Sequence, residues 1–280
     1  MSGSVAIIGC GWLGHALAKQ LLTDNYKVTV TTQSKEKQLK LQQENIDTEI
    51  LSLPVSEHED VKLSVFNHDT LVIAITPQIR QGRDDYPQKV AQLVKLAESG
   101  KVKKVILLSS TAVYNGLSGL VNEQATLDIN AHKVAIITAA EQAARHFSGE
   151  TVILRLAGLV GDDRHPGRFL QGKKLLSDPQ AFINLIHQDD VVGVIRELIA
   201  EQEVSGTFNA VSATETCKKH YYHAAASALN LPAAEFSSES SMHFGKRING
   251  EKLRERFDYS FIHDDLIAWL HETAAGSENV

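Results

Sequence analysis

Several features of common protein classes are missing from this chain of 280 residues. Its only cysteines are Cys10 and Cys217, too few for a disulfide framework and typical of a protein in a reducing compartment. No apolar run approaches the roughly 18 residues of a membrane-spanning helix. The N-terminal apolar segment is short, lacks a basic flank and leads straight into a glycine turn, so it does not resemble a signal peptide. These absences predict a cytoplasmic protein without a membrane contact.

A basic surface is also missing. The formal net charge is −6, and the lysines and arginines form no stripe, which argues against nucleic acid as a partner. The composition, with 43% hydrophobic and 22% charged residues, is that of an ordinary globular protein. The length suits one large α/β domain or one domain with a smaller lobe. We expect a monomer or homodimer whose partner is a small-molecule substrate.

The most informative stretch lies at the N-terminus. The apolar run Val5–Ile8 predicts a buried strand, and Gly-Cys-Gly-Trp-Leu-Gly follows from Gly9 before leucines at helical spacing. Strand, glycine turn and helix form the context in which this pattern predicts a dinucleotide site rather than a chance turn. Gly9 permits the tight turn, Gly11 lets the backbone approach a pyrophosphate, and Gly14 lets the helix lie close to the sheet. The helix N-terminus then faces the phosphates.

Strands and helices alternate after this motif. Mostly apolar strands separated by amphipathic helices predict a parallel sheet covered on both faces, a doubly wound Rossmann sheet. Residues 1–160 are the predicted dinucleotide-binding core, and 161–280 a small C-terminal substrate-binding lobe, with 185–212 returning to the core as helix plus strand. The expected strands are 5–8, 28–32, 48–53, 69–76, 102–108, 151–156 and 206–211, and the expected core helices are 35–44, 86–98, 134–146 and 189–200.

The end of the second strand indicates which cofactor binds. A site for NAD normally has Asp or Glu there to bind the adenosine ribose, whereas this chain has Thr32, Gln33, Ser34 and Lys35 and no carboxylate before Glu36. Hydroxyl, amide and ammonium groups bind a 2′-phosphate that an acid repels, so the sequence favours NADP over NAD. Lys35 is alternatively a solvated residue of the next helix. The predicted cofactor-binding residues are Gly9, Gly11, Trp12, Leu13, Gly14, Thr32, Gln33, Ser34, Lys35, Ile75, Thr76, Pro77, Ser109, Ala157 and Gly158.

Further motifs accompany the glycine turn. They are Ser109–Gly116 (Ser-Ser-Thr-Ala-Val-Tyr-Asn-Gly), Leu154–Gly161, His187–Val192, Gly206–Asn209, and Arg247–Asn249 with Leu253 and Arg254. With them the chain resembles, nearly end to end, the extended short-chain dehydrogenase/reductases, which include the nucleotide-sugar epimerases. The loop 164–169 and the Gly-Trp-Leu-Gly turn are similar to an atypical bacterial branch, the YeeZ-like proteins. The resemblance implies a Rossmann core, a substrate lobe and hydride-transfer chemistry.

One departure from this family concerns catalysis. Active members carry Tyr-x-x-x-Lys, in which the lysine lowers the pKa of the tyrosine that acts as general acid and base. None of the six tyrosines here has a lysine four residues later. Counting back from Glu141, the position where the family has its catalytic tyrosine is Lys133, and the position where it has the lysine is Ile137. The usual catalytic pair is absent.

Three residues remain as catalytic candidates. Ser110 matches the family's substrate-polarising hydroxyl, and its alternative role is to cap a turn. His132 and Lys133 are candidate replacements for the missing base, or else exposed residues at a helix start. We expect no metal site, because His220 and His223 lack a third ligand at suitable spacing.

A loop rich in Gly, Pro, Asp and Arg supplies the candidate substrate contacts. Arg164 and Arg168 flank His165, and two guanidinium groups there suit a phosphate or carboxylate, although a solvated loop is the alternative. Two functions remain open. One is an NADP-dependent oxidoreductase or epimerase-like enzyme acting on a small polar substrate that carries a sugar or phosphate. The other is a non-catalytic NADP-binding redox sensor or regulator.

Overall fold

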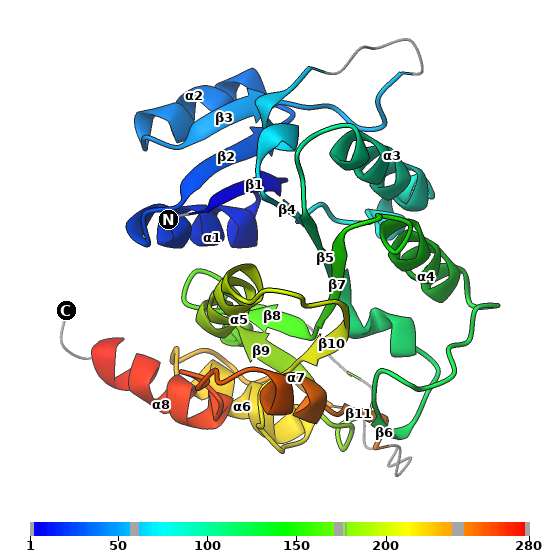
Figure 1. Cartoon of the computed structure of the whole chain (residues 1–280). Coiled ribbons are helices and arrows are strands. Elements are labelled where there is room, and N and C mark those ends of the chain that lie inside the picture. Colours follow the sequence, from blue (N-terminus) through cyan, green and yellow to red (C-terminus); the bar gives the residue numbers. More distant parts are fainter. Residues whose placement is uncertain (1–2, 57–61, 171–175, 177, 237–243, 278–280) are drawn as a thin grey trace. The chain divides into compact units, whose positions relative to one another are not determined.

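The computed structural model describes residues 3–56, 62–170, 176, 178–236 and 244–277. Its main feature is a seven-stranded sheet of order β10-β7-β5-β4-β1-β2-β3 (Figure 1). β1 pairs in parallel with both β2 and β4, and β3 and β5 extend the sheet in parallel on either side. The strands are β1 (Ser4–Ile8), β2 (Lys27–Thr32), β3 (Asp47–Ile50), β4 (Thr70–Ile73), β5 (Lys104–Ser110), β7 (Glu150–Leu156) and β10 (Gly206–Ala210).

This strand order confirms the predicted doubly wound Rossmann sheet. The chain builds outward from β1 through β2 to β3, then returns to the other side of β1 with β4 and continues through β5. β1 and β4 are therefore neighbours whose connections leave in opposite directions. In such sheets ligands bind outside the carboxyl ends of the strands at this switch point.

The larger helices alternate with these strands. They are α1 (Trp12–Thr23), α2 (Lys35–Gln43), α3 (Tyr86–Glu98), α4 (His132–Ala144) and α5 (Gln188–Ala200). α3 and α4 lie side by side (Figure 1) and bury their apolar faces against β1, β4, β5 and β7. The predicted helix 134–146 begins at His132, so both catalytic candidates at its start lie in the first turn of α4.

One predicted strand is shorter than its apolar run. Residues 69–76 read as a strand, but β4 ends at Ile73. Ala74 N still donates to Ile8 O at 2.9 Å, and the chain then leaves the ladder before Pro77, which has no N–H to donate. The end of the run therefore forms a loop at the edge of the sheet.

Contacts divide the chain into two compact units. The first comprises residues 1–113, 128–155 and 195–208, and the second comprises 114–127, 156–194 and 209–280. The prediction placed one boundary at residue 160 and one return to the core at 185–212. In the structure each unit consists of three segments, so the chain passes between the units more often. Among the described residues, no helix is long and apolar enough to cross a membrane.

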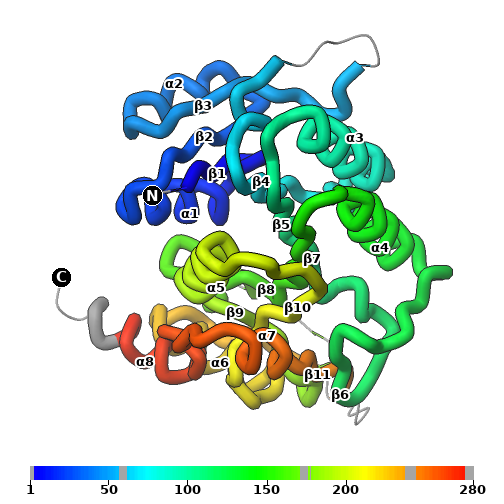
Figure 2. Tube along the Cα trace, in the orientation of Figure 1, coloured from blue at the N-terminus to red at the C-terminus, as the bar shows by residue number. Residues whose placement is uncertain are grey.

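The second unit is built from short elements. Tyr221, Leu266 and Trp269 are buried in its apolar core, where α6 and α8 lie together (Figure 2). Two parallel two-stranded sheets, β8–β9 and β6–β11, complete it. The elements are β6 (Gly119–Val121), β8 (Gly158–Val160), β9 (Leu185–His187), α6 (Lys218–Ser227), β11 (Lys246–Ile248), α7 (Glu251–Arg256) and α8 (Leu266–Ser277), and 3₁₀ turns lie at Ser64–Asn67, Ile79–Gln81, Thr111–Tyr114 and Pro166–Arg168.

Candidate cofactor-binding site

The glycine turn is fixed against the end of β2. Gly9 has φ +101°, a conformation that residues with a side chain rarely adopt, and an added Cβ would lie 3.1 Å from Ala74 O. Gly9 N donates to Thr31 Oγ1 at 3.1 Å, and Cys10 N donates to Thr31 O at 3.0 Å. Backbone and side chain of one β2 residue therefore hold the turn in place.

The other two glycines differ in what surrounds them. A Cβ at Gly14 would lie 2.4 Å from Gly9 O, so only glycine lets α1 pack this closely behind the turn. A Cβ at Gly11 would meet nothing within 4 Å. This is the geometry that the motif requires, because one glycine permits close packing and the other leaves space beside its backbone for a pyrophosphate.

The first turn of α1 is suited to binding an anion. Gly11 is the N-cap of this helix, no side chain caps it, and no acidic residue lies in its first turn. The initial N–H groups of a helix lack intrahelical partners, and the helix dipole makes this end positive. Phosphate groups bind at such termini.

A pocket of about 370 Å³ lies beside the glycine turn, within the first unit. The residues just after β1, β2 and β4 form much of its wall, which places the pocket at the switch point of the sheet. No Asp or Glu is among the described residues that line it. These residues are Ile8, Gly9, Cys10, Gly11, Thr31, Thr32, Gln33, Ser34, Lys37, Leu51, Leu53, Ala74, Ile75, Thr76, Gln78 and Lys89.

The lysine on this wall is not the predicted one. Lys35 Nζ donates to Gln38 Oε1 at 2.8 Å within α2, and Lys35 is not part of the pocket wall. Ser34 is the N-cap of α2, and its Oγ accepts from Lys37 N at 3.3 Å. Lys37 lines the pocket and is exposed. Recognising Ser34 as an N-cap was the sequence signal that could have identified the first-turn residue Lys37.

A second lysine of the wall was also missed. Lys89 is 6% exposed, and its Nζ lies 2.9 Å from Asp85 Oδ1. A hydrogen bond from Arg83, followed by the Lys89 ammonium, lowers the pKa of Asp85 to about 2. The carboxylate therefore stays ionised and compensates the buried charge of Lys89. Its position one helical turn after Asp85 was the available sequence signal.

Several predicted cofactor residues do lie on this wall. They include Thr32 at the end of β2, Gln33 and Ser34 just after it, and Ile75 and Thr76 after β4. The remaining predicted residues of this region, Trp12, Leu13, Gly14 and Pro77, do not line the pocket.

Ser109 has a structural contact instead. Its Oγ donates to Glu141 Oε1 at 2.6 Å, and this carboxylate is fully buried. Arg155 binds the same carboxylate twice, with Nε 2.9 Å from Oε1 and Nη2 2.7 Å from Oε2. The hydroxyl thus belongs to a buried ion-pair network that joins β5, α4 and β7. No sequence spacing indicated this network, because its members are brought together by the fold.

The remaining two predicted cofactor residues lie in the second unit. Ala157 is buried, and its N–H donates to Ala210 O at 3.0 Å. Gly158 begins β8, where an added Cβ would lie 2.6 Å from Leu185 Cδ2. Close packing on β9 accounts for this glycine within its own unit.

The predicted catalytic residues occupy the end of β5 and the start of α4. Ser110 Oγ accepts from Ala112 N at 3.1 Å, so it caps a turn, and a hydroxyl that accepts a bond still has its own hydrogen to donate. His132 Nε2 lies 3.3 Å from Asp84 Oδ1, and both side chains are about two-thirds exposed. Lys133 is half-buried. Ile137, at the position where the family has its catalytic lysine, is buried and apolar.

The arginine loop is organised around a histidine. His165 is buried, and its Nδ1 accepts from Gly167 N at 3.2 Å, which caps the 3₁₀ turn Pro166–Arg168. Burial lowers the pKa of His165, so its imidazole is the neutral form that such a cap requires. Arg164 and Arg168 are exposed on either side. The guanidinium carbon of Arg164 lies 5.9 Å from the centre of the Phe169 ring.

The thiol in the glycine turn is a packing group. Cys10 is 3% exposed, and burial raises its pKa to about 11. A helix N-terminus lowers the pKa of a nearby thiol, but the rise caused by burial is the larger effect at Cys10. Cys10 therefore remains a thiol at neutral pH.

Comparison with known proteins identifies the family. A family model described as NAD(P)H-binding matches residues 9–202. The chain belongs to this NAD(P)H-binding family. Protein YeeZ of Escherichia coli (strain K12) is 30% identical over 267 residues, which cover 93% of this chain and 96% of YeeZ. These matches confirm the resemblance to an atypical extended short-chain dehydrogenase/reductase.

Solved structures of other proteins share the fold. The human epimerase family protein SDR39U1 with NADPH has a TM-score of 0.71 at 17% identity, covering 99% of this chain and 100% of that chain. UDP-glucuronic acid 4-epimerase from Bacillus cereus in complex with NAD has a TM-score of 0.74 at 14% identity, covering 98% and 99%. Because these two complexes hold different cofactors, the fold alone does not choose between NAD and NADP.

Proposed function

We propose that this family member binds NADP in preference to NAD. The observation that carries the proposal is the wall after β2, where Thr32, Gln33, Ser34 and Lys37 line the pocket and no acidic residue does so among those described. An NAD site normally has a carboxylate here for the ribose hydroxyls. Hydroxyl, amide and ammonium groups instead supply hydrogen bonds and one positive charge for a 2′-phosphate.

The glycine turn supports the rest of the cofactor. The space beside Gly11 and the uncapped N-terminus of α1 fit a pyrophosphate, since a Cβ at Gly11 would meet no atom within 4 Å. The apolar side chains of Leu51, Leu53 and Ile75 offer surface for an adenine ring. When bound, a nicotinamide cofactor supplies a hydride donor or acceptor.

We further propose an oxidoreductase or epimerase-like activity on a small polar substrate that carries a sugar or phosphate. Ser110 polarises the substrate carbonyl with its free hydroxyl hydrogen. His132, whose Nε2 lies 3.3 Å from Asp84 Oδ1, transfers the proton that the family's tyrosine normally handles. Lys133 is the alternative proton donor, and Arg164 and Arg168 are the proposed contacts for the substrate's anionic group.

The decisive test is hydride transfer from labelled NADPH to a broad panel of carbonyl compounds. We expect turnover on at least one compound by the wild type and its loss in Ser110→Ala. Ser118→Ala, which removes another exposed serine hydroxyl, serves as the matched control and should retain activity. Equal turnover in Ser110→Ala and the control would exclude the assigned role of Ser110.

The second candidate function is a non-catalytic NADP-binding redox sensor or regulator. It is favoured by one specific observation, the absence of Tyr-x-x-x-Lys, with Ile137 buried at the position where the family has its catalytic lysine. Tight NADPH binding without turnover on any compound of the panel would support this function and overturn the enzyme proposal.

A further inference from the structure

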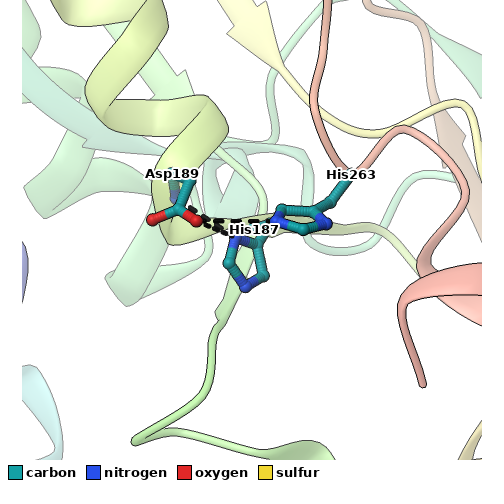
Figure 3. Close-up of side chains that lie close together, drawn as sticks. All are labelled: His187, Asp189 and His263. Atoms are coloured by element: carbon teal, nitrogen blue, oxygen red, sulfur yellow. Dashed lines mark hydrogen bonds and ion pairs between the residues drawn. The ribbon is translucent and has the colours of Figure 1, made fainter. Parts of the chain in front are cut away.

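We propose that the second unit holds a divalent metal ion of the zinc type at His187, Asp189 and His263. These residues belong to a different unit from the proposed cofactor pocket. Their spacing in the sequence did not predict a metal site. His187 ends β9, Asp189 lies in the first turn of α5, and His263 lies in the loop before α8. Figure 3 shows the two imidazole rings converging on one carboxylate oxygen, Asp189 Oδ2.

The separations between the polar atoms fit metal ligands. Asp189 Oδ2 lies 3.5 Å from His187 Nδ1 and 3.5 Å from His263 Nε2, and all three ligand atoms lie within 4.8 Å of one another. Zinc binds nitrogen and oxygen at about 2.0–2.1 Å in a tetrahedron, whose edges are then about 3.4 Å. A charge-assisted hydrogen bond would instead bring these atoms to about 2.7–2.9 Å. Both separations from Asp189 Oδ2 are therefore closer to an edge of such a tetrahedron than to the length of a charge-assisted hydrogen bond.

His187 has one partnered and one unpartnered ring nitrogen within the described part of the chain. Its side chain is 3% exposed, yet Nε2 has no partner there. Nδ1 accepts from Asp189 N at 3.2 Å, a hydrogen bond that a metal ion at Nδ1 would replace. Buried polar groups are normally paired. Both this hydrogen bond and a metal ion at Nδ1 require the tautomer that carries its proton on Nε2.

A buried carboxylate positions the third ligand. Asp190 is fully buried and accepts from Ile262 N at 2.6 Å and from His263 N at 3.0 Å. Tyr259 Oη also donates to it at 3.1 Å. These bonds fix the loop before α8 beside the start of α5. Asp190 is therefore a positioning residue, which metal sites commonly have behind their ligands.

The surroundings define the kind of site. The ring of Trp269 lies 4.8 Å from that of His187 and 6.3 Å from that of His263, so one side is apolar. The side chain of Asp189 is 54% exposed, so the opposite side faces solvent. Three protein ligands leave a fourth position for water, and two imidazoles with one carboxylate are a donor set that zinc binds.

The test uses the full chain without a polyhistidine tag, stripped by a chelator and titrated with Zn²⁺ and Co²⁺. We expect one ion per chain by calorimetry and the absorption spectrum of tetrahedral cobalt. In a Trp12→Phe background Trp269 is the only tryptophan, and Co²⁺ should quench its fluorescence. His263→Ala should weaken binding at least about tenfold, and Asp190→Asn about tenfold.

Controls separate metal binding from folding. His271→Ala removes an exposed histidine of α8 and should leave binding unchanged. His263→Cys keeps a zinc ligand and should bind, which a purely structural role would not produce. If His187→Ala fails to fold by circular dichroism, the half-exposed Asp189→Asn tests the same ligand set.

Two results would overturn the proposal. One is binding only at millimolar metal, and the other is binding that survives His263→Ala unchanged. NADPH affinity measured on the same samples is independent of this outcome, so failure of the metal site and failure of the proposed cofactor preference are distinguishable.

Discussion

Replacing one lysine of α2 should selectively weaken the binding of NADPH. Lys37 lines the pocket, whereas Lys35 is bonded to Gln38 at 2.8 Å and does not. A hydrogen bond to a charged group contributes about 1.5–3 kcal/mol, and we reduce this to about 1–2 kcal/mol because Lys37 is exposed. Lys37→Gln should therefore raise the Kd for NADPH about 5- to 30-fold. Its Kd for NADH should stay unchanged, because NADH has no 2′-phosphate.

Calorimetry with both cofactors measures this effect, and Lys35→Gln is the matched control. The control has the same charge change two residues away and should alter the Kd for NADPH less than about twofold. The difference between variants should shrink at high salt, since exposed charges are screened. A larger loss in Lys35→Gln than in Lys37→Gln, or an equal loss for NADH, would refute the assignment.

Further predictions concern stability and thiol reactivity. Glu141→Ala removes the buried carboxylate that binds Arg155 and should lower the free energy of unfolding by about 3–5 kcal/mol in urea denaturation. A hydrogen bond from Ser4 and then one from a lysine lower the pKa of Asp69 from 3.8 to about 2, so the carboxylate stabilises the fold above pH 3.8 and loses this effect as the pH falls toward 2. Asp69→Asn should cost at most about 1 kcal/mol at pH 7, because the group is half exposed, and this cost should vanish below pH 2. An equal loss at pH 7 and below pH 2 would contradict this. Cys10, whose pKa is raised to about 11, should react with a thiol reagent only on unfolding, while the other cysteine reacts in the native state.

The sequence was sufficient to predict the Rossmann sheet because its signals are local. The apolar run before Gly9 and the alternation of strands with helices depend on neighbouring residues, and the parallel topology follows from the connections. Element ends were less predictable. β4 stops at Ile73 although the apolar run continues to Thr76, because the chain must leave the sheet to reach the pocket wall.

Site residues that depend on tertiary contacts were beyond sequence reasoning. Thr31 fixes the glycine turn from 22 residues away, and Ser109 is held by a glutamate 32 residues away. Lys37, by contrast, was within reach of sequence reasoning, because Ser34 could be recognised as the N-cap that places Lys37 in the first turn of α2. His187 and His263 meet only through the loop that Asp190 holds. No spacing rule links such pairs.

Cofactor preference is the central claim, and one calorimetric comparison tests it directly. NADPH and NADH are titrated into the wild-type chain under identical buffer and salt. The composition of the wall after β2 predicts that NADPH binds at least about tenfold more tightly, from about 1.4 kcal/mol of phosphate contacts. Equal or tighter binding of NADH would contradict the reading of Thr32, Gln33, Ser34 and Lys37 as a phosphate site.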